Sequence, residues 1–140
     1  MFGCGKAMQV YFINDAQTWK SLSFPTLGAE WAHIATVADA NGMYIYYDGQ
    51  LVADNADGAT TILDNAGSLL DLGQDIRYPS ETLNRNSNSS FDNFHVWSSA
   101  RTAAENQNNL ENCMTGTETG LELYIEFSEG TETQISSVLG

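Results

Sequence analysis

The 140-residue chain is long enough for one folded domain and too short to support two separate cores. Its net charge is −13, and its 5 basic residues are scattered, so the basic stripe that tracks nucleic-acid phosphates cannot be assembled. No apolar run approaches the length of a membrane span, and no basic region followed by an apolar stretch marks a signal peptide. The composition predicts a soluble, packed domain with no nucleic-acid partner and no membrane insertion.

The first third of the chain is rich in strand signals. Two β-rich runs, separated by a short polar segment, predict a hairpin at 7–13 and 17–24. Further on, Asn41-Gly42 and Asp48-Gly49 mark tight type I′ turns, because glycine takes positive φ freely and Asn and Asp tolerate it better than most residues. These turns predict an antiparallel meander with strands at 31–38, 43–47 and 50–53.

Strand alternation divides the aromatic residues of this meander between two faces. Tyr44 and Tyr46 fall on one face of their strand, and Tyr47 falls on the other. Neither face is purely polar, which predicts a central position in a sheet that is covered on at least part of both sides. We expect Trp31 and Trp97 to pack in the core.

The second half of the chain alternates polar loops with short strands. The loops cover 54–66 and 74–90, and the strands cover 68–72, 91–97, 121–127 and 133–138. One helix is predicted at 103–113, because Thr102 and Glu105 form a capping box and Gly116 stands where a C-cap would. Many strands with one short helix predict an all-β fold, an antiparallel sandwich.

A few residue types leave alternatives open. Cys4 and Cys113 either form one bridge between the two ends of the chain or stay free, and two cysteines make neither a disulfide scaffold nor a zinc site. The excess of acidic residues is either a solvated surface or a source of oxygen ligands for Ca²⁺. We expect His33 to be a hydrogen-bonded structural residue and His95 to lie at the surface.

Three stretches of the chain carry a family resemblance. They are Trp31–Ala35 with Tyr46–Val52, Phe91–Trp97 with Arg101–Glu105, and Leu123–Gly130. Together they resemble the laminin G-like family, which has the concanavalin A-like, pentraxin-type jelly-roll fold, and with their connecting strands they cover about residues 8–137. Ser89 and Ser128 depart from the family pattern, which often has Gly at the first position and Asp or Asn at the second.

The third motif occupies an unusual place. In the family it commonly opens the domain, whereas here it follows the predicted helix. We expect residues 120–138 to supply the opening strand of a single, circularly permuted domain spanning 1–140, because the first and last strands of a jelly roll are neighbours. A fragment of a longer chain, or a strand exchanged between two chains, are the alternatives.

The resemblance implies a binding module, and two kinds of site follow from it. Related sandwiches often hold a structural Ca²⁺, which here would use Asp92, Glu129 and the Gly130 carbonyl. A glycan is the ligand that the resemblance favours, and aromatic rings stacked against a pyranose would bind it. The candidate contacts are Trp19, Tyr44, Tyr46, Tyr47 and Tyr78. The resemblance also implies an extracellular or cell-surface location.

Two other functions remain in view. The first is a protein-interaction or adhesion module, which would form a homodimer with its tyrosines buried at the interface. The second, more remote, is a glycoside hydrolase using Glu122 and Glu126, which lie on one face of a predicted strand and resemble the paired glutamates of laminarinase-type enzymes. The central Asp of that enzyme motif is replaced by Tyr124, so we expect a protein without catalytic activity.

Overall fold

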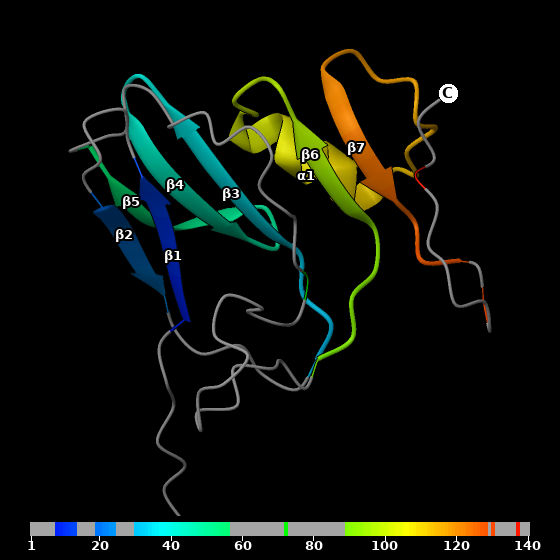
Figure 1. The fold of residues 1–140 in the computed structure, drawn as a ribbon, viewed down its shortest axis with the longest axis horizontal. Helices are drawn as coiled ribbons and strands as arrows, with labels where there is room; N and C mark the ends of the chain where they lie inside the picture. The colour runs from blue at the N-terminus through cyan, green and yellow to red at the C-terminus, as the bar shows by residue number, and fades with distance from the viewer. Residues whose placement is uncertain are drawn as a thin grey trace, which may run out of the picture.

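A computed structural model describes residues 8–13, 19–24, 30–56, 72, 89–128, 130 and 137. Within these residues the chain forms seven strands and one helix (Figure 1). In chain order they are β1 (Met8–Ile13), β2 (Trp19–Phe24), β3 (Ile34–Asp39), β4 (Gly42–Tyr47), β5 (Gln50–Asn55), β6 (Phe94–Trp97), α1 (Ala103–Glu111) and β7 (Leu121–Ile125). Apart from Leu72 and Ser137, the strands predicted at 68–72 and 133–138 lie outside the described residues.

The predicted meander is the three-stranded sheet β3-β4-β5, with β4 in the centre. Both neighbours pair with β4 in the antiparallel sense, and a β-bulge interrupts the pairing with β5 between Ile45 and Tyr46. The first strand begins at Ile34, three residues later than predicted, so Trp31 lies before the paired part of the sheet.

The turn between β4 and β5 has the predicted geometry. Asp48 and Gly49 have φ values of 46° and 75°, as a type I′ turn requires. Asp48 also fastens this turn to the residue before β3: its carboxylate Oδ1 accepts a hydrogen bond from the amide of His33 at 2.8 Å, and its own amide donates to the His33 carbonyl at 2.9 Å.

The turn between β3 and β4 differs from the prediction. Because Asp39 pairs with Gly42, its central residues are Ala40 and Asn41, and neither of them has a positive φ. The Asp39 Oδ1 atom accepts hydrogen bonds from the amides of Asn41 at 2.7 Å and Gly42 at 3.0 Å. The type I′ prediction for Asn41-Gly42 was therefore wrong, because the Asp39 side chain stabilises a different turn one residue earlier.

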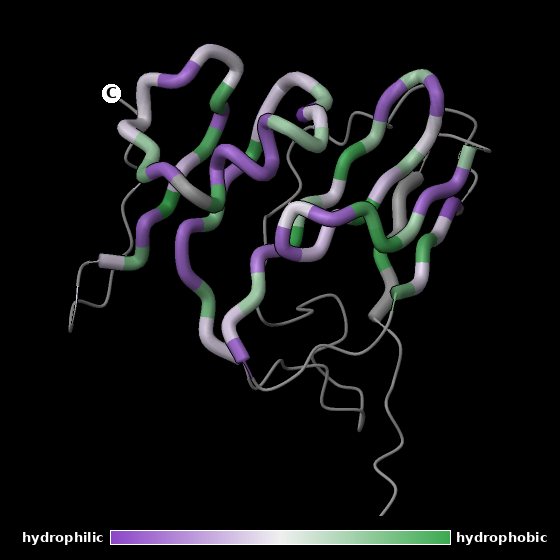
Figure 2. The backbone as a smooth tube through the Cα atoms, turned by 180° about the vertical axis from the view of Figure 1, so that it is seen from behind, coloured by the Kyte–Doolittle hydropathy of each residue, from purple (hydrophilic) through white to green (hydrophobic). Residues whose placement is uncertain are grey.

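The core lies between this sheet and the β1-β2 hairpin. Leu22 and Phe24 of β2 pack against Met43 and Ile45 of β4, both of which are 0% exposed. Partly buried residues complete the cluster: Val10, Ile34, Ala38 and Ala53. Hydrophobic and hydrophilic positions alternate along these strands in Figure 2, as expected for strands with one face on a core. Two antiparallel layers with one short helix confirm the all-β sandwich class.

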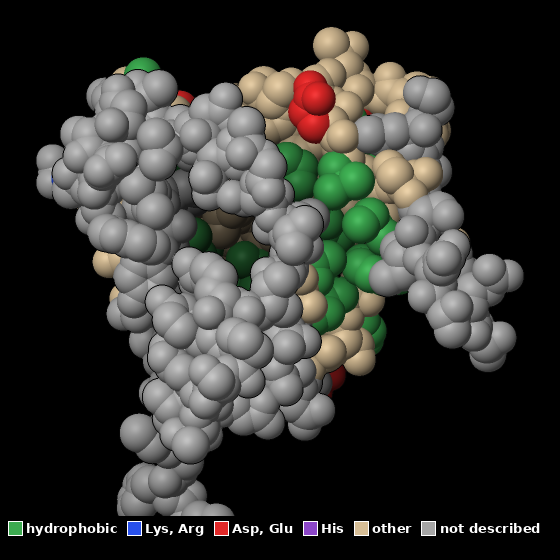
Figure 3. All heavy atoms as spheres, viewed as in Figure 1, with side chains coloured by type: hydrophobic (Ala, Val, Ile, Leu, Met, Phe, Trp, Pro, Cys, Tyr) green, Lys and Arg blue, Asp and Glu red, His purple; other side chains and the backbone are tan. Residues whose placement is uncertain are grey.

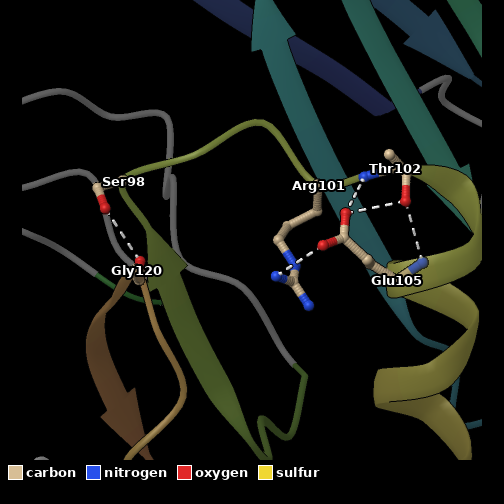
Figure 4. Close-up of polar contacts among 5 residues, drawn as sticks. All are labelled: Ser98, Arg101, Thr102, Glu105 and Gly120. Carbon is tan, nitrogen blue, oxygen red and sulfur yellow. Dashed lines mark hydrogen bonds and ion pairs between the residues drawn. The ribbon is translucent and has the colours of Figure 1, made fainter.

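A second antiparallel sheet is formed by β6 and β7, with a register shift between Val96 and Trp97. The Tyr124 hydroxyl donates to the side-chain carbonyl of Asn93 at 2.9 Å. The Gly120 carbonyl accepts hydrogen bonds from the Ser98 amide at 2.9 Å and from the Ser98 hydroxyl at 3.1 Å, which holds the end of β6 to the start of β7 (Figure 4).

Helix α1 begins with the predicted capping box. The Thr102 hydroxyl accepts from the Glu105 amide at 3.3 Å, and the Glu105 carboxylate accepts from the Thr102 amide at 2.8 Å (Figure 4). These hydrogen bonds hold the pKa of Glu105 below its usual value. An ion pair of 3.1 Å joins the same carboxylate to Arg101.

The helix ends at Glu111, two residues earlier than predicted. Asn112 is the C-cap, in an extended conformation, and its side-chain amide donates to the Asn108 carbonyl at 3.0 Å. This side chain ends the helix before Gly116, so the prediction of Gly116 as C-cap was wrong. α1 has nine residues and is mostly hydrophilic (Figure 2), and the described part of the chain contains no helix that could cross a membrane.

Candidate functional site

A cavity of about 990 Å³ lies between β3 and β6. Consecutive residues line it, in the segments 30–38 and 89–101, together with Leu72 and Asn106. Neighbouring residues of a strand point to opposite faces of its sheet. A cavity that is lined by consecutive residues of a strand therefore runs along the edge of that strand. In the described part of the chain β3 pairs only with β4 and β6 only with β7, so these two edges have no described strand between them.

Two exposed aromatic side chains stand at the rim of the cavity. Trp31 is 71% exposed and Phe91 is 44% exposed. Each precedes a strand, and the segments before β3 and before β6 lie side by side in Figures 1 and 2. Exposed polar residues surround them: Glu30, Ser90, Asp92 and Asn93. The expected core position of Trp31 was wrong, because the paired part of β3 begins beyond it.

A stack of side chains forms one wall of the cavity. The His33 and His95 rings stack with their centroids 6.1 Å apart, and Trp97 meets His95 edge-on at 5.9 Å. The Arg101 guanidinium lies 4.0 Å from the centroid of the Trp97 ring. The stack therefore runs from the residue before β3 across to the residue before the α1 cap. His95, which we expected at the surface, is half-buried within it.

The two histidines favour the neutral state. Burial lowers the pKa of His33, and the nearby His95 lowers it further, against an opposing effect of Asp48. Burial also lowers the pKa of His95, while its hydrogen bond to the Asn93 carbonyl opposes the shift and Arg101 adds to it. An uncharged imidazole pair is consistent with close stacking, because two imidazolium ions at this separation would repel each other.

The described cavity lining contains buried polar atoms without a hydrogen-bond partner. Four buried nitrogen atoms have no hydrogen-bond partner in the described part of the chain: His33 Nδ1, Trp97 Nε1, Arg101 Nε and Asn106 Nδ2. Asn106 is only 3% exposed. Indole, guanidinium and side-chain amide N–H groups can only donate. The N–H groups of Trp97, Arg101 and Asn106 could therefore bind a ligand group that accepts hydrogen bonds.

The predicted glycan contacts lie away from this cavity or outside the described residues. Among the described residues, Tyr44, Tyr46 and Tyr47 do not line it. Tyr47 pairs with the core residue Ile34 and so points to the opposite face from the other two, and Tyr46 is buried. Tyr78 and the side chain of Trp19 lie outside the description. A role of these five residues in ligand binding stays a prediction.

The predicted calcium ligands are only partly described. Asp92 and Gly130 are exposed, and Glu129 lies outside the described residues. Within the described ranges, no three His, Cys, Asp or Glu side chains come together. Since Ca²⁺ takes about six to eight oxygen ligands, the described donors alone do not fit the ion. Calcium binding stays a prediction.

The remaining reactive side chains are exposed. Glu122 and Glu126 are on the surface of β7 and just beyond it, and the Ser128 hydroxyl donates to Glu126 at 2.9 Å. Neither of these two described glutamates lines the cavity. Cys113 is an exposed free thiol, which agrees with the alternative of free cysteines, and Cys4 lies outside the described residues.

Comparisons with known proteins agree with this fold. A sequence family described as the concanavalin A-like lectin/glucanases superfamily matches residues 3–105. The chain is also similar to the crystal structure of a "putative carbohydrate binding protein" from Bacteroides ovatus, with a TM-score of 0.65 and 24% identity. The likeness covers 84% of this chain and 35% of that one, and at this identity it shows the fold alone. A comparison with curated proteins finds no match.

Proposed function

Because the chain belongs to the concanavalin A-like lectin/glucanase superfamily, we propose that it is a non-catalytic module that binds carbohydrate in the cavity between β3 and β6. The family and the description of the similar Bacteroides ovatus protein support the ligand class. The position of the binding site rests on one observation: Trp31, a large aromatic side chain, is 71% exposed at the rim of the cavity.

The chemistry of the rim suits a sugar. The flat, apolar face of a pyranose stacks on an aromatic ring, and an exposed indole offers the largest such surface. Phe91 adds a second ring from the other side of the cavity, and Asp92 and Asn93 supply acceptors and donors for hydroxyl groups. A concave site with apolar surface and a few polar groups is the usual form of a small-ligand site.

A glycan array followed by titration calorimetry tests this proposal. We expect Trp31→Ala to weaken the best array ligand at least tenfold, about 1.4 kcal/mol, while Trp31→Phe retains most of the affinity. Tyr44→Ala is the matched control, an aromatic residue outside the described cavity lining, and we expect it to change the affinity less than twofold. If Tyr44→Ala abolishes binding and Trp31→Ala does not, the site lies on the tyrosine face. If no glycan binds, the proposed function is wrong.

The absence of catalysis is part of the proposal. The superfamily includes glucanases, and the two candidate carboxylates, Glu122 and Glu126, lie apart from the described cavity lining. We expect no reducing-sugar release from any array ligand. Release that disappears in Glu122→Gln or Glu126→Gln would establish an enzyme instead.

A separate observation favours the interaction module as a second candidate function. Hydrophobic side chains gather over β6 and β7 in Figure 3, where Val96 is 40% exposed. Register places Phe94, Val96, Leu123 and Ile125 on one face, and none of them is charged. In a chain of net charge −13, such a face lets two copies meet without opposing carboxylates. Light scattering tests this dimer: Val96→Lys should convert it to a monomer, and a monomeric parent chain excludes it.

A further inference from the structure

Part of the cavity wall holds buried nitrogen atoms that have no hydrogen-bond partner among the described residues. Trp97 Nε1, Arg101 Nε and Asn106 Nδ2 are buried without a partner in the described part of the chain, and His33 Nδ1 is in the same condition. All four residues line the one cavity, and the ring stack from His33 to Arg101 joins three of them. A buried donor that is left unpaired is destabilising, so the three obligate donors of Trp97, Arg101 and Asn106 favour entry of an acceptor.

The charges around the cavity exclude an anionic acceptor. Glu30 and Asp92 stand at the rim, and the chain as a whole carries −13. Arg101 is the one cationic residue in the described cavity lining, and its charge is already paired with Glu105 at 3.1 Å. A carboxylate or sulfate group would therefore lose its hydration without a free counter-charge. The acceptor that this wall takes is neutral.

The donors also distinguish between neutral acceptors. A sugar hydroxyl that accepts from Trp97 or Asn106 brings a proton of its own, and because Trp97 Nε1, Arg101 Nε and Asn106 Nδ2 accept no hydrogen bond, that proton has to find a further acceptor in the lining. An amide carbonyl has two lone pairs and no proton, so it can accept from two donors and leave nothing unpaired. Its methyl group would meet apolar lining such as that of Val37.

On these grounds, and resting on the proposed function above, we propose that the cavity is selective for N-acetylated saccharides, with the acetamido carbonyl accepting hydrogen bonds from Asn106 Nδ2 and Trp97 Nε1. Both atoms are closed to water in the free chain. Neighbouring side chains of the cavity wall therefore have to shift when the ligand enters.

Two trisaccharides that differ at one position of each ring test the selectivity. Triacetylchitotriose carries an acetamido group where cellotriose carries a hydroxyl, and both have the same linkage. By titration calorimetry we expect the acetylated sugar to bind at least tenfold more tightly. Glucuronic acid and N-acetylglucosamine, compared as monosaccharides, separate an anionic from a neutral acceptor, and we expect only the second to compete.

Substitutions on α1 test whether Asn106 causes the preference for the acetylated sugar. Asn106→Leu keeps the branched shape of the side chain and removes the donor, so we expect the preference for the acetylated sugar to fall below threefold. Asn109→Leu is the matched control, because Asn109 Nδ2 is also buried without a partner but Asn109 does not belong to the described cavity lining. It should keep the full preference. If Asn106→Leu does not fold, Trp97→Phe removes the other N–H donor while keeping an aromatic ring, and it gives the same expectation.

The outcomes separate this inference from the proposed function. Equal binding of the two trisaccharides, or a preference that survives both Asn106→Leu and Trp97→Phe, overturns the acetamido inference and leaves carbohydrate binding in place. Binding of other array glycans with neither trisaccharide bound also overturns it. A chain that binds no glycan at all overturns both.

Discussion

His33 and His95 stack across the gap between the β3-β4-β5 sheet and the β6-β7 sheet, with ring centroids 6.1 Å apart and planes inclined by 24°. His33 stands directly before β3, where two hydrogen bonds with Asp48 fix its backbone, and His95 is in β6. The pair therefore connects the two edges that border the cavity. Any charge on it acts on the relative position of those edges.

This pair makes stability depend on pH. Burial lowers both pKa values in the folded chain, so the unfolded chain binds more protons at mildly acidic pH. The stabilisation is complete above the unfolded histidine pKa of about 6.5 and is lost as the pH falls below it. We expect the free energy of unfolding to fall between about pH 7.5 and 5.5, by at most about 1.4 kcal/mol per pH unit for each histidine.

Other groups near the pair also carry charge. The contribution of the two histidines is therefore measured as a difference in stability between the parent chain and a variant that lacks both. Asp48 faces His33, and Arg101 with its partner Glu105 faces His95. Approach to the isoelectric point of about 4.1 relieves repulsion among the acidic residues and opposes the histidine effect. Urea unfolding of the chain and of His33→Gln/His95→Gln across this range isolates the pair. Identical pH profiles for the two proteins would show that the histidines titrate normally.

The core at β4 predicts a second stability difference. Ile45 is fully buried against Leu22 and Phe24, so Ile45→Ala leaves a cavity and should cost about 2–5 kcal/mol. Leu51 is 51% exposed on the neighbouring strand, and Leu51→Ala should cost less than about 1 kcal/mol. Urea unfolding with an unchanged m-value measures both. Similar losses for the two substitutions would contradict the assignment of the core.

Local signals in the sequence predicted the central sheet well. Asp48-Gly49 was placed correctly because two consecutive positive φ values leave few residue types to choose from. Asn41-Gly42 carries a similar signal, yet the Asp39 carboxylate binds two amides and moves the turn back by one residue. A side chain that competes for backbone amides is visible in the sequence, but its effect on register depends on how the strands pair.

The candidate site was harder to predict, since it depends on where pairing begins. Alternation placed Trp31 in the core on the assumption that the strand starts at that residue, and it starts at Ile34. The polar neighbours Glu30, Ser90 and Asp92 were the available signal that Trp31 and Phe91 stand at strand ends. The unpaired donors of Trp97 and Asn106 come from a strand and a helix brought together in three dimensions, and no spacing in the sequence shows them.

Motif order supported one longer-range prediction. The C-terminal motif was expected to take the place of an opening strand. In the described residues, β7 of this motif pairs with β6, the strand of the second motif. Whether residues 120–138 complete a single permuted domain stays a prediction. A chain that ends before β7 should unfold without a cooperative transition, because the two-stranded sheet would lose one of its strands.

The capping box at α1 gives a prediction with a conservative control. Thr102→Ala removes the hydroxyl that accepts from the Glu105 amide, and we expect it to cost about 0.5–2 kcal/mol. Thr102→Ser keeps the acceptor and should cost less than half as much. Urea unfolding measures both values. An equal loss for Ser and Ala would show that the threonine methyl group, rather than the cap, contributes the stability.

Calcium binding predicts a stabilisation that other divalent ions do not reproduce. If Glu129 and the Gly130 carbonyl close on Asp92, calcium at about 100 times its Kd should raise the free energy of unfolding by about 2.7 kcal/mol. Magnesium is the control, because any divalent ion screens a chain of net charge −13, whereas the smaller Mg²⁺ demands a stricter geometry. Asp92→Asn keeps the shape of the side chain and removes its charge. It should therefore abolish the additional stabilisation by calcium and leave the smaller stabilisation by charge screening that both ions share. Equal unfolding curves in calcium and in magnesium would show that Asp92 is an exposed surface residue and not a calcium ligand.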